Sequence, residues 1–495
     1  MKTLPTRLAP AIFSLLLTSI LIPPTVVDAQ DDAARLISAM LGDTPLVDDL
    51  RSLTQEIGGR ATGSEANLRS VEWALERFTS AGVSARKEAF QMPSLWLENG
   101  ASARVFGGEI SFNAEIVSMP FSAETPEGGL TAPLLDAGSG SEADFERLGA
   151  QVNDSFLLVE TDQLVDIEGL FAEYYDAFAI EGRAAESGAA GVVYMGSRAP
   201  GNMYRHNSSL QDERARPMII MDRTHAARAL GLLRSGIPLS ITVDLDLQLG
   251  GPYDSYNVIG EIPGSLQPEE VVVVGAHLDA WDLGGGALDN GSNVSILIDV
   301  ARQMTRLGIR PARTIRFALW NGEEQGLVGS MGYTLSHEAE LDDHVVAMSF
   351  DIGCGLINGF FTGGRPEILP TVEKAVEPIK GLGPFALIDI PIVGTDNFDF
   401  MMQGVANLVG SHESASYGPN YHAESDQFEE CDQHSLRLNS AIIAAATLGF
   451  ANTEVSWSRQ SREEIERLIA TTDLEQQMRS FNVWRDWGVG KRGRE

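Results

Sequence analysis

The stretch that decides the fold reads VVVVGAHLDAWDLGGGALDN and spans residues 271–290. Its opening run of four valines is typical of a strand buried on both faces of a parallel sheet. His277-Leu278-Asp279 follows directly, and a glycine-rich loop then leads to Asp289, just before a helix predicted over Asn293–Leu307. The stretch therefore predicts a strand–loop–helix unit that carries metal-binding side chains in its loop.

The same kind of unit recurs further along the chain. Apolar strands are predicted at Thr314–Trp320, Val345–Phe350 and Ala406–Val409, and helical stretches alternate with them. The predicted helices are Gly326–Ser336, Ile368–Ile379 and Ser435–Ala451. Alternation of this kind predicts an α/β fold in which a mostly parallel, mixed sheet is flanked by helices.

The 495 residues are too many for one ordinary domain, and the texture of the sequence predicts five segments. Residues 121–250 differ from their surroundings, because short strands alternate there with glycine-rich turns around one helix predicted over Phe178–Ser187. We expect this stretch to be an inserted β-rich module. The segments are a signal peptide (1–29), the N-terminal part of the main domain (30–120), the insert (121–250), the metal-binding part of the main domain (251–455) and a C-terminal helical extension (456–495).

The first 29 residues are typical of a secretory signal. Lys2 and Arg7 accompany an apolar stretch, Ala11–Ile22, that is too short to span a bilayer, and Val27-Asp28-Ala29 offers small residues for cleavage before Gln30. We find no later stretch long and apolar enough for a transmembrane helix. We therefore expect a secreted or periplasmic protein with no stable membrane span after removal of the signal.

Composition limits the partners that the chain can have. Its formal net charge of −33 disfavours nucleic acid and anionic membrane surfaces, because both would repel it. Cys354 and Cys431 are the only cysteines, so the chain is not a disulfide-stapled scaffold. In an exported protein the two could pair, and two separate buried thiols are equally compatible with the sequence.

Five side chains that can bind a metal ion follow predicted strands, either at once or in the next loop. They are His277, Asp289, Glu324, Asp351 and His422. Ligands collect at the carboxyl ends of the strands in such a sheet, so we expect the five to meet there. Two imidazoles and three carboxylates suit zinc or a similar ion. The charges balance if two dications are joined by one bridging hydroxide, which predicts two Zn²⁺ ions per chain.

Two further acids are predicted to act in catalysis. Asp279 lies two residues from His277, so on an extended chain both side chains point to the same side and Asp279 can orient the imidazole. Glu323 adjoins the ligand Glu324 and stays free as a general base, which takes a proton from a shared water and passes it to the leaving amine. One histidine or one glutamate pair alone is more often structural; five converging groups argue for a metal site.

These residues resemble the motifs of peptidase family M28, the co-catalytic zinc exopeptidases. The matching residues are His277-Leu278-Asp279, Asp289-Asn290, Asn321-Gly322-Glu323-Glu324, Asp351 and Tyr421-His422 with Ser425-Asp426. The resemblance implies that Asp289 bridges two metal ions, that His277 and Asp351 complete one site, and that Glu324 and His422 complete the other. It also implies a protease-associated domain as the insert, a preference for short peptides, especially dipeptides, and a homodimer.

Two other functions are compatible with the fold. A receptor-like or binding protein could keep the fold without the chemistry, although the presence of all five ligands and Glu323 disfavours it. A glutaminyl cyclase of the same superfamily would hold a single zinc ion, so metal content separates it from the exopeptidases. Amino-terminal, carboxyl-terminal and dipeptide specificity are all compatible with the motifs.

Overall fold

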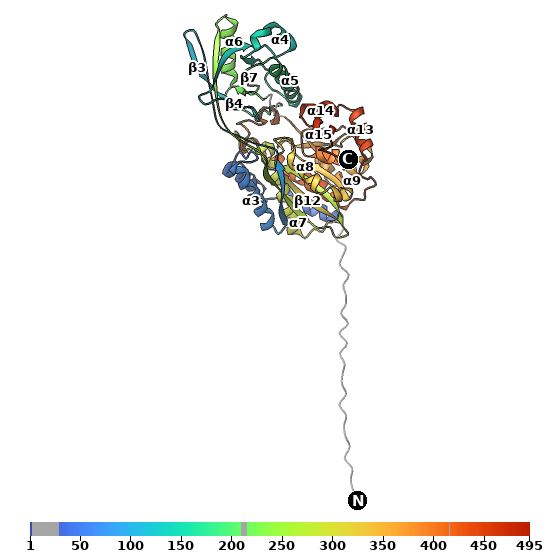
Figure 1. Cartoon of the computed structure of the whole chain (residues 1–495). Coiled ribbons are helices and arrows are strands. Elements are labelled where there is room, and N and C mark those ends of the chain that lie inside the picture. Colours follow the sequence, from blue (N-terminus) through green and yellow to red (C-terminus); the bar gives the residue numbers. More distant parts are fainter. Residues whose placement is uncertain (2–28, 209–214, 415) are drawn as a thin grey trace.

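The computed structural model describes Met1 and residues 29–208, 215–414 and 416–495, so nearly all of the predicted signal lies outside the described residues. Figure 1 shows two lobes, and each is built on one eight-stranded sheet. Among the helices of the described part, none has the length and apolar character needed to cross a membrane.

The first sheet contains the predicted parallel strands at its centre. β11 pairs in parallel with β12 and with β13, and β13 pairs in parallel with β16. Antiparallel strands flank this centre. In spatial order the strands are β1 (Ser84–Met92), β10 (Tyr253–Ile262), β12 (Arg313–Trp320), β11 (Gln267–His277), β13 (His344–Ser349), β16 (Asn407–His412), β14 (Ile357–Phe361) and β15 (Ala386–Ile388).

Helices cover both faces of this sheet, which explains the unbroken valine run of β11. Val272 and Val274 pack into the largest core cluster with α7 and α12, whereas Val271 and Val273 point to the other face and pack near α8 and α10. This confirms the predicted fold class. The first face is covered by α1 (Ala29–Met40), α2 (Leu46–Arg51), α3 (Glu65–Ser80), α7 (Ser292–Leu307), α9 (Leu369–Val376) and α12 (Gln433–Asn452). On the other side lie α8 (Val328–Ser336), α10 (Asn397–Met402), α13 (Arg462–Thr471), α14 (Leu474–Ser480) and α15 (Trp484–Gly488).

The second sheet builds the other lobe, which we call the second lobe. Its strands in spatial order are β3 (Ile110–Ala114), β2 (Leu95–Gly107), β9 (Leu239–Gly250), β5 (Leu130–Asp136), β6 (Phe156–Val159), β7 (Gly191–Met195), β8 (Met218–Met221) and β4 (Ile116–Ser118). The helices α4 (Glu142–Leu148), α5 (Ile167–Glu186) and α6 (Arg223–Arg234) pack on its two faces.

This lobe differs in two respects from what the sequence suggested. Its sheet takes in β2, β3 and β4, which precede residue 121, because β2 pairs with β9 from Leu95 opposite Gly250 to Phe106 opposite Ser240. Such a pairing between distant strands leaves no local signal. The helix predicted over Phe178–Ser187 is the second half of a longer helix, α5, which begins at Ile167.

Cys354 and Cys431 form a disulfide, with 5.3 Å between their Cα atoms. The bond joins the loop after β13 to the segment that leads into α12. Of the two alternatives that the sequence allowed, the structure therefore has the paired form.

A candidate metal centre at the strand ends

The five side chains singled out in the sequence meet at the carboxyl ends of the central strands, and all five are buried. His277 is the last residue of β11, Asp351 follows β13, and Glu324 follows β12. Asp289 lies in the turn that leads into α7, and His422 follows the short helix α11 (Tyr417–Asn420). Parallel neighbours bring their loops to one edge, so residues distant in sequence come together here.

The ligand atoms form two groups that share Asp289, and within each group they lie within 4.8 Å of one another. In the first group, His277 Nε2 lies 2.9 Å from Asp289 Oδ1 and 2.8 Å from Asp351 Oδ1. In the second, His422 Nε2 lies 2.8 Å from Glu324 Oε2 and 3.4 Å from Asp289 Oδ2. We call these the first and the second metal position.

The electrostatics of both positions favour a cation. Asp289 Oδ2 and Glu324 Oε1 are buried oxygens without a hydrogen-bond donor among the described residues. Burial and the Asp289 carboxylate raise the pKa of Glu324 well above its usual range. Burial lowers the pKa of His277, but the carboxylates of Asp351 and Glu323 outweigh it and raise that pKa well above its usual range. This number of nitrogen and carboxylate donors fits zinc. A bound zinc ion would take the place of the protons that Glu324 and His277 otherwise retain.

The imidazole of His422 is already suited to bind a metal. Burial lowers its pKa to about 4, so the ring is neutral. Its Nδ1 lies 3.2 Å from the backbone oxygen of Arg205. A hydrogen bond from Nδ1 to this oxygen leaves the lone pair of Nε2 facing Asp289 and Glu324.

Glu323 borders the site without belonging to either ligand group. It lines both small cavities in front of the metal positions together with His422, and one of them together with Asp351. Burial raises the pKa of Glu323 well above its usual range, and the nearby carboxylates of Asp351 and Asp396 add to this effect. A carboxyl group placed in this way can accept and return a proton.

Asp279 connects two loops of the site. Its backbone oxygen lies 3.0 Å from His277 Nδ1, whereas its carboxylate oxygen Oδ1 lies 3.7 Å away. Oδ2 accepts hydrogen bonds from Thr62 Oγ1 at 2.7 Å and from the backbone N–H of Gly322 at 2.9 Å. The backbone of Asp279 therefore orients the imidazole more directly than its carboxylate, which ties the His277 loop to the Glu323 loop.

Asp426 also shapes the site, although the sequence analysis gave it no role. Its carboxylate accepts the backbone N–H groups of Ala287, Leu288 and Asp289 at 2.9, 2.7 and 3.1 Å. It thereby fixes the turn that presents the shared ligand Asp289. An acid four residues after His422 was the available signal, but only the folded chain shows which N–H groups it binds.

The sequence also contained no sign that Arg60 and Asp396 lie at the site, because their positions appear only in the folded chain. Arg60 is fully buried and donates to the backbone oxygens of Leu278, Gly285 and Gly286 in the loop between His277 and Asp289. Asp396 is 1% exposed, and neither of its carboxylate oxygens has a hydrogen-bond donor among the described residues. No spacing motif links these residues to the five ligands.

Residues of the second lobe and of the C-terminal helical segment line the space in front of the metal positions. Two adjoining cavities of about 70 and about 90 Å³ lie there, and both are lined by Tyr174 of α5 and by Phe481, which follows α14. The rings of Tyr174 and Phe481 stack with centroids 5.4 Å apart. Tyr174 Oη also lies 3.1 Å from Tyr421 Oη, beside the ligand His422. Residues of the second lobe and of the C-terminal segment therefore border a small space in front of the metal positions.

The metal-binding part of the chain is similar to known peptidases. Residues 257–447 match the model of "Peptidase family M28". A protein named "Carboxypeptidase Q" from Bos taurus is 27% identical over 413 residues, which cover 82% of this chain and 85% of that protein. A protein named "Probable lipoprotein aminopeptidase LpqL" from Mycobacterium tuberculosis is 26% identical over 433 residues, covering 79% and 80%.

A solved structure agrees with these matches. The crystal structure of a peptidase M28 precursor from Shewanella amazonensis SB2B superimposes with a TM-score of 0.79 at 27% identity. The superposition covers 88% of this chain and 99% of that one. The comparisons bear out the resemblance to family M28 over residues 257–447 and the class of enzyme that the motifs predicted, a zinc-dependent exopeptidase.

Proposed function

The metal-binding part of this chain belongs to peptidase family M28, and we propose that the protein is an exported exopeptidase that binds two zinc ions and hydrolyses short peptides, dipeptides foremost. The observation that carries the proposal is the position of Asp289, whose two oxygens serve two separate ligand groups. A single-zinc site would need only one of these groups. This supports a two-metal peptidase over the glutaminyl cyclase alternative.

In the proposed reaction, Glu323 handles the proton. A bound pair of zinc ions would polarise the substrate carbonyl and lower the pKa of the attacking water. Glu323 accepts the proton of that water and delivers it to the leaving amine. His277, Asp289, Glu324, Asp351 and His422 serve as metal ligands, and Asp279 holds the His277 loop in place.

The small volume and the lining of the site support a small substrate with a free amino terminus. The two cavities before the metal positions measure about 70 and about 90 Å³, which leaves little room for a long peptide. Among the described residues that line them, the acids are Asp289, Glu323, Glu324 and Asp351, and none is lysine or arginine. Bound zinc ions would offset the charges of Asp289, Glu324 and Asp351, so Glu323 is the acid that remains to attract a protonated amine of the substrate.

A panel of blocked substrates tests this proposal. We expect hydrolysis of a free dipeptide and of its carboxyl-terminal amide, and loss of hydrolysis when the amino terminus is acetylated or when 1,10-phenanthroline removes the metal. Hydrolysis of the acetylated dipeptide at an equal rate would refute the amino-terminal preference. A zinc-loaded protein inert toward all short peptides would favour the receptor-like alternative.

The remaining expectations are parts of the same proposal. Residues 1–29 direct export to the periplasm or the medium, and the second lobe contains a protease-associated module that encloses the site. The protein forms a homodimer. Mass spectrometry of the exported protein should give Gln30 as its first residue, and light scattering should give twice the mass of one chain.

A further inference from the structure

The second lobe reaches into the metal centre through residues 202–208, which follow β7 and which we call the 202–208 segment. The segment runs antiparallel to the loop of His422: Tyr204 pairs with Ala423, and the backbone N–H of Arg205 donates to the His422 oxygen at 3.0 Å. In return, the Arg205 oxygen faces His422 Nδ1 at 3.2 Å. The imidazole is thus oriented by the second lobe.

His422 needs this support because of its backbone. Its φ of 57° lies in the left-handed region, which residues with a side chain rarely adopt. Pairing with Arg205 on both its oxygen and its ring fixes this conformation. Glu324, which also belongs to the second position, is held by the same segment, because Asn207 Nδ2 donates to its backbone oxygen at 2.5 Å.

The side chain of Arg205 holds the 202–208 segment in place through hydrogen bonds and ion pairs to both lobes. It is 1% exposed and forms a two-pronged ion pair with Asp282, at 3.0 and 2.7 Å, in the loop after β11. It also donates to Glu98 of β2 at 2.9 Å and to the Ser118 oxygen of β4 at 2.8 Å. Two carboxylates and a carbonyl therefore fix one guanidinium, and that guanidinium fixes the backbone oxygen that His422 uses.

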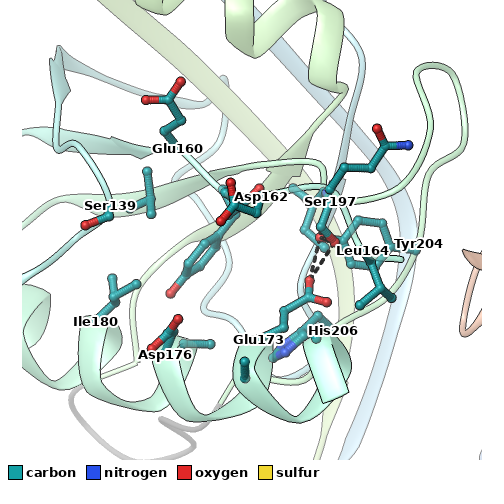
Figure 2. A pocket seen from close by; sticks show the side chains of 18 of the residues that line it. Ser139, Glu160, Asp162, Leu164, Glu173, Asp176, Ile180, Ser197, Tyr204 and His206 are labelled. Atoms are coloured by element: carbon teal, nitrogen blue, oxygen red, sulfur yellow. Dashed lines mark hydrogen bonds between the residues drawn. The ribbon is translucent and has the colours of Figure 1, made fainter. Parts of the chain in front are cut away.

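A polar cluster inside the second lobe holds the segment from its other side. Figure 2 shows Glu173 of α5 bonded to Ser197 and Tyr204, on the wall of a cavity of about 270 Å³. Glu173 also pairs with Arg198, whose guanidinium donates to the Tyr421 oxygen at 3.3 Å. The segment is therefore anchored on both sides.

The first metal position is built differently. His277 Nδ1 finds its acceptor in the backbone of Asp279, within the first lobe, and Asp351 follows a strand of the first sheet. Resting on the two-metal proposal above, we infer that Arg205 and Asn207 are positioning residues for the second metal position, so that the second lobe is a structural part of that position and not of the first.

Stepwise metal binding tests this inference. Arg205→Met keeps the backbone oxygen that His422 uses but removes the guanidinium that fixes it. We expect one zinc ion to bind as in the wild type and the other about 10- to 100-fold more weakly, the range typical of altered outer partners of a metal-bound histidine. Asn207→Ala removes one hydrogen bond without emptying the core and should weaken the same step by a smaller factor. Calorimetric titration of the metal-free protein with Zn²⁺ measures both steps, and excess zinc should restore activity.

Arg234→Met is the matched control, because Arg234 also binds two carboxylates of the second lobe, Asp136 and Glu160, but lies on α6. It should leave both binding steps unchanged. Wild-type affinity for both ions in Arg205→Met and in Asn207→Ala, or equal weakening of both steps, would overturn the inference. A wild-type protein that binds a single ion would instead overturn the proposed function.

Discussion

At the scale of single residues, the site depends on how two adjacent glutamates differ. Glu324 lies against His422 with 2.8 Å between Oε2 and Nε2, whereas Glu323 faces the cavity and joins neither ligand group. Neighbouring side chains after a strand point in different directions, so one can bind metal while the other handles protons. The two glutamates have different proposed roles because their side chains point in different directions, although their residue type is the same.

Replacing Glu323 separates these roles. Glu323→Gln removes the proton acceptor but leaves every ligand in place, so kcat should fall by a factor on the order of 10²–10⁴ with zinc content unchanged. Turnover of a free dipeptide and metal analysis by mass spectrometry check this. The matched variant Glu324→Gln should release zinc from the second position. Loss of zinc in Glu323→Gln alone would mean that the two roles are reversed.

Asp426 should matter for metal binding although it binds no metal. Asp426→Ala leaves the N–H groups of Ala287, Leu288 and Asp289 without their acceptor, and we expect a loss of at least ~2 kcal/mol in unfolding free energy. Because the affected turn presents the shared ligand, zinc should be retained more weakly at both positions. Thermal melting and dialysis against a chelator measure the two effects.

Asp432→Ala provides the comparison for that variant. Asp432 accepts the N–H of Ser435 at the start of α12, so its loss should cost about 1 kcal/mol, as for an ordinary helix cap. Zinc retention should stay at the wild-type value. Equal zinc loss in both variants would show that general destabilisation, and not the turn, weakens metal binding.

At the scale of elements, the strands of the first sheet could be predicted from the sequence, but the contacts between distant elements could not. The valine run of β11 and the apolar run of β12 carry their own signal, because burial on both faces demands continuous apolar residues. Contacts such as that of His337, at the end of α8, with Glu88 of edge strand β1 leave no trace in local sequence. They depend on which elements become neighbours.

The contact between His337 and Glu88 predicts that the stability of the protein depends on pH. Burial lowers the pKa of His337, but Glu88 and Glu340 outweigh it and raise that pKa above its usual value. The stabilisation is therefore fully present below the unfolded-state pKa of about 6.5 and is lost as pH rises through the folded-state pKa. We expect His337→Gln to lower the melting temperature more at pH 6 than at pH 9. An equal decrease at both values would contradict the charged bridge.

At the scale of the whole molecule, the sequence predicted the fold class, the resemblance to family M28 and the five proposed metal ligands, whose side chains lie together in the structure. Each of the five lies after a strand with a strong local pattern, either at once or in the next loop, and the metal chemistry limits which residues can meet. The sequence predicted an insert that begins at residue 121. The sheet of the second lobe also includes β2, β3 and β4, which precede that residue. The contribution of this lobe to His422 could not be predicted either, because it rests on the backbone oxygen of Arg205.

The central claim is that one carboxylate, that of Asp289, holds two metal ions. Zinc per chain, measured by mass spectrometry on the purified wild type and on Asp289→Ala, tests it most directly. The account predicts two zinc ions per chain in the wild type and loss of both in the variant. One zinc ion in the wild type, or one retained at full affinity in Asp289→Ala, would contradict it.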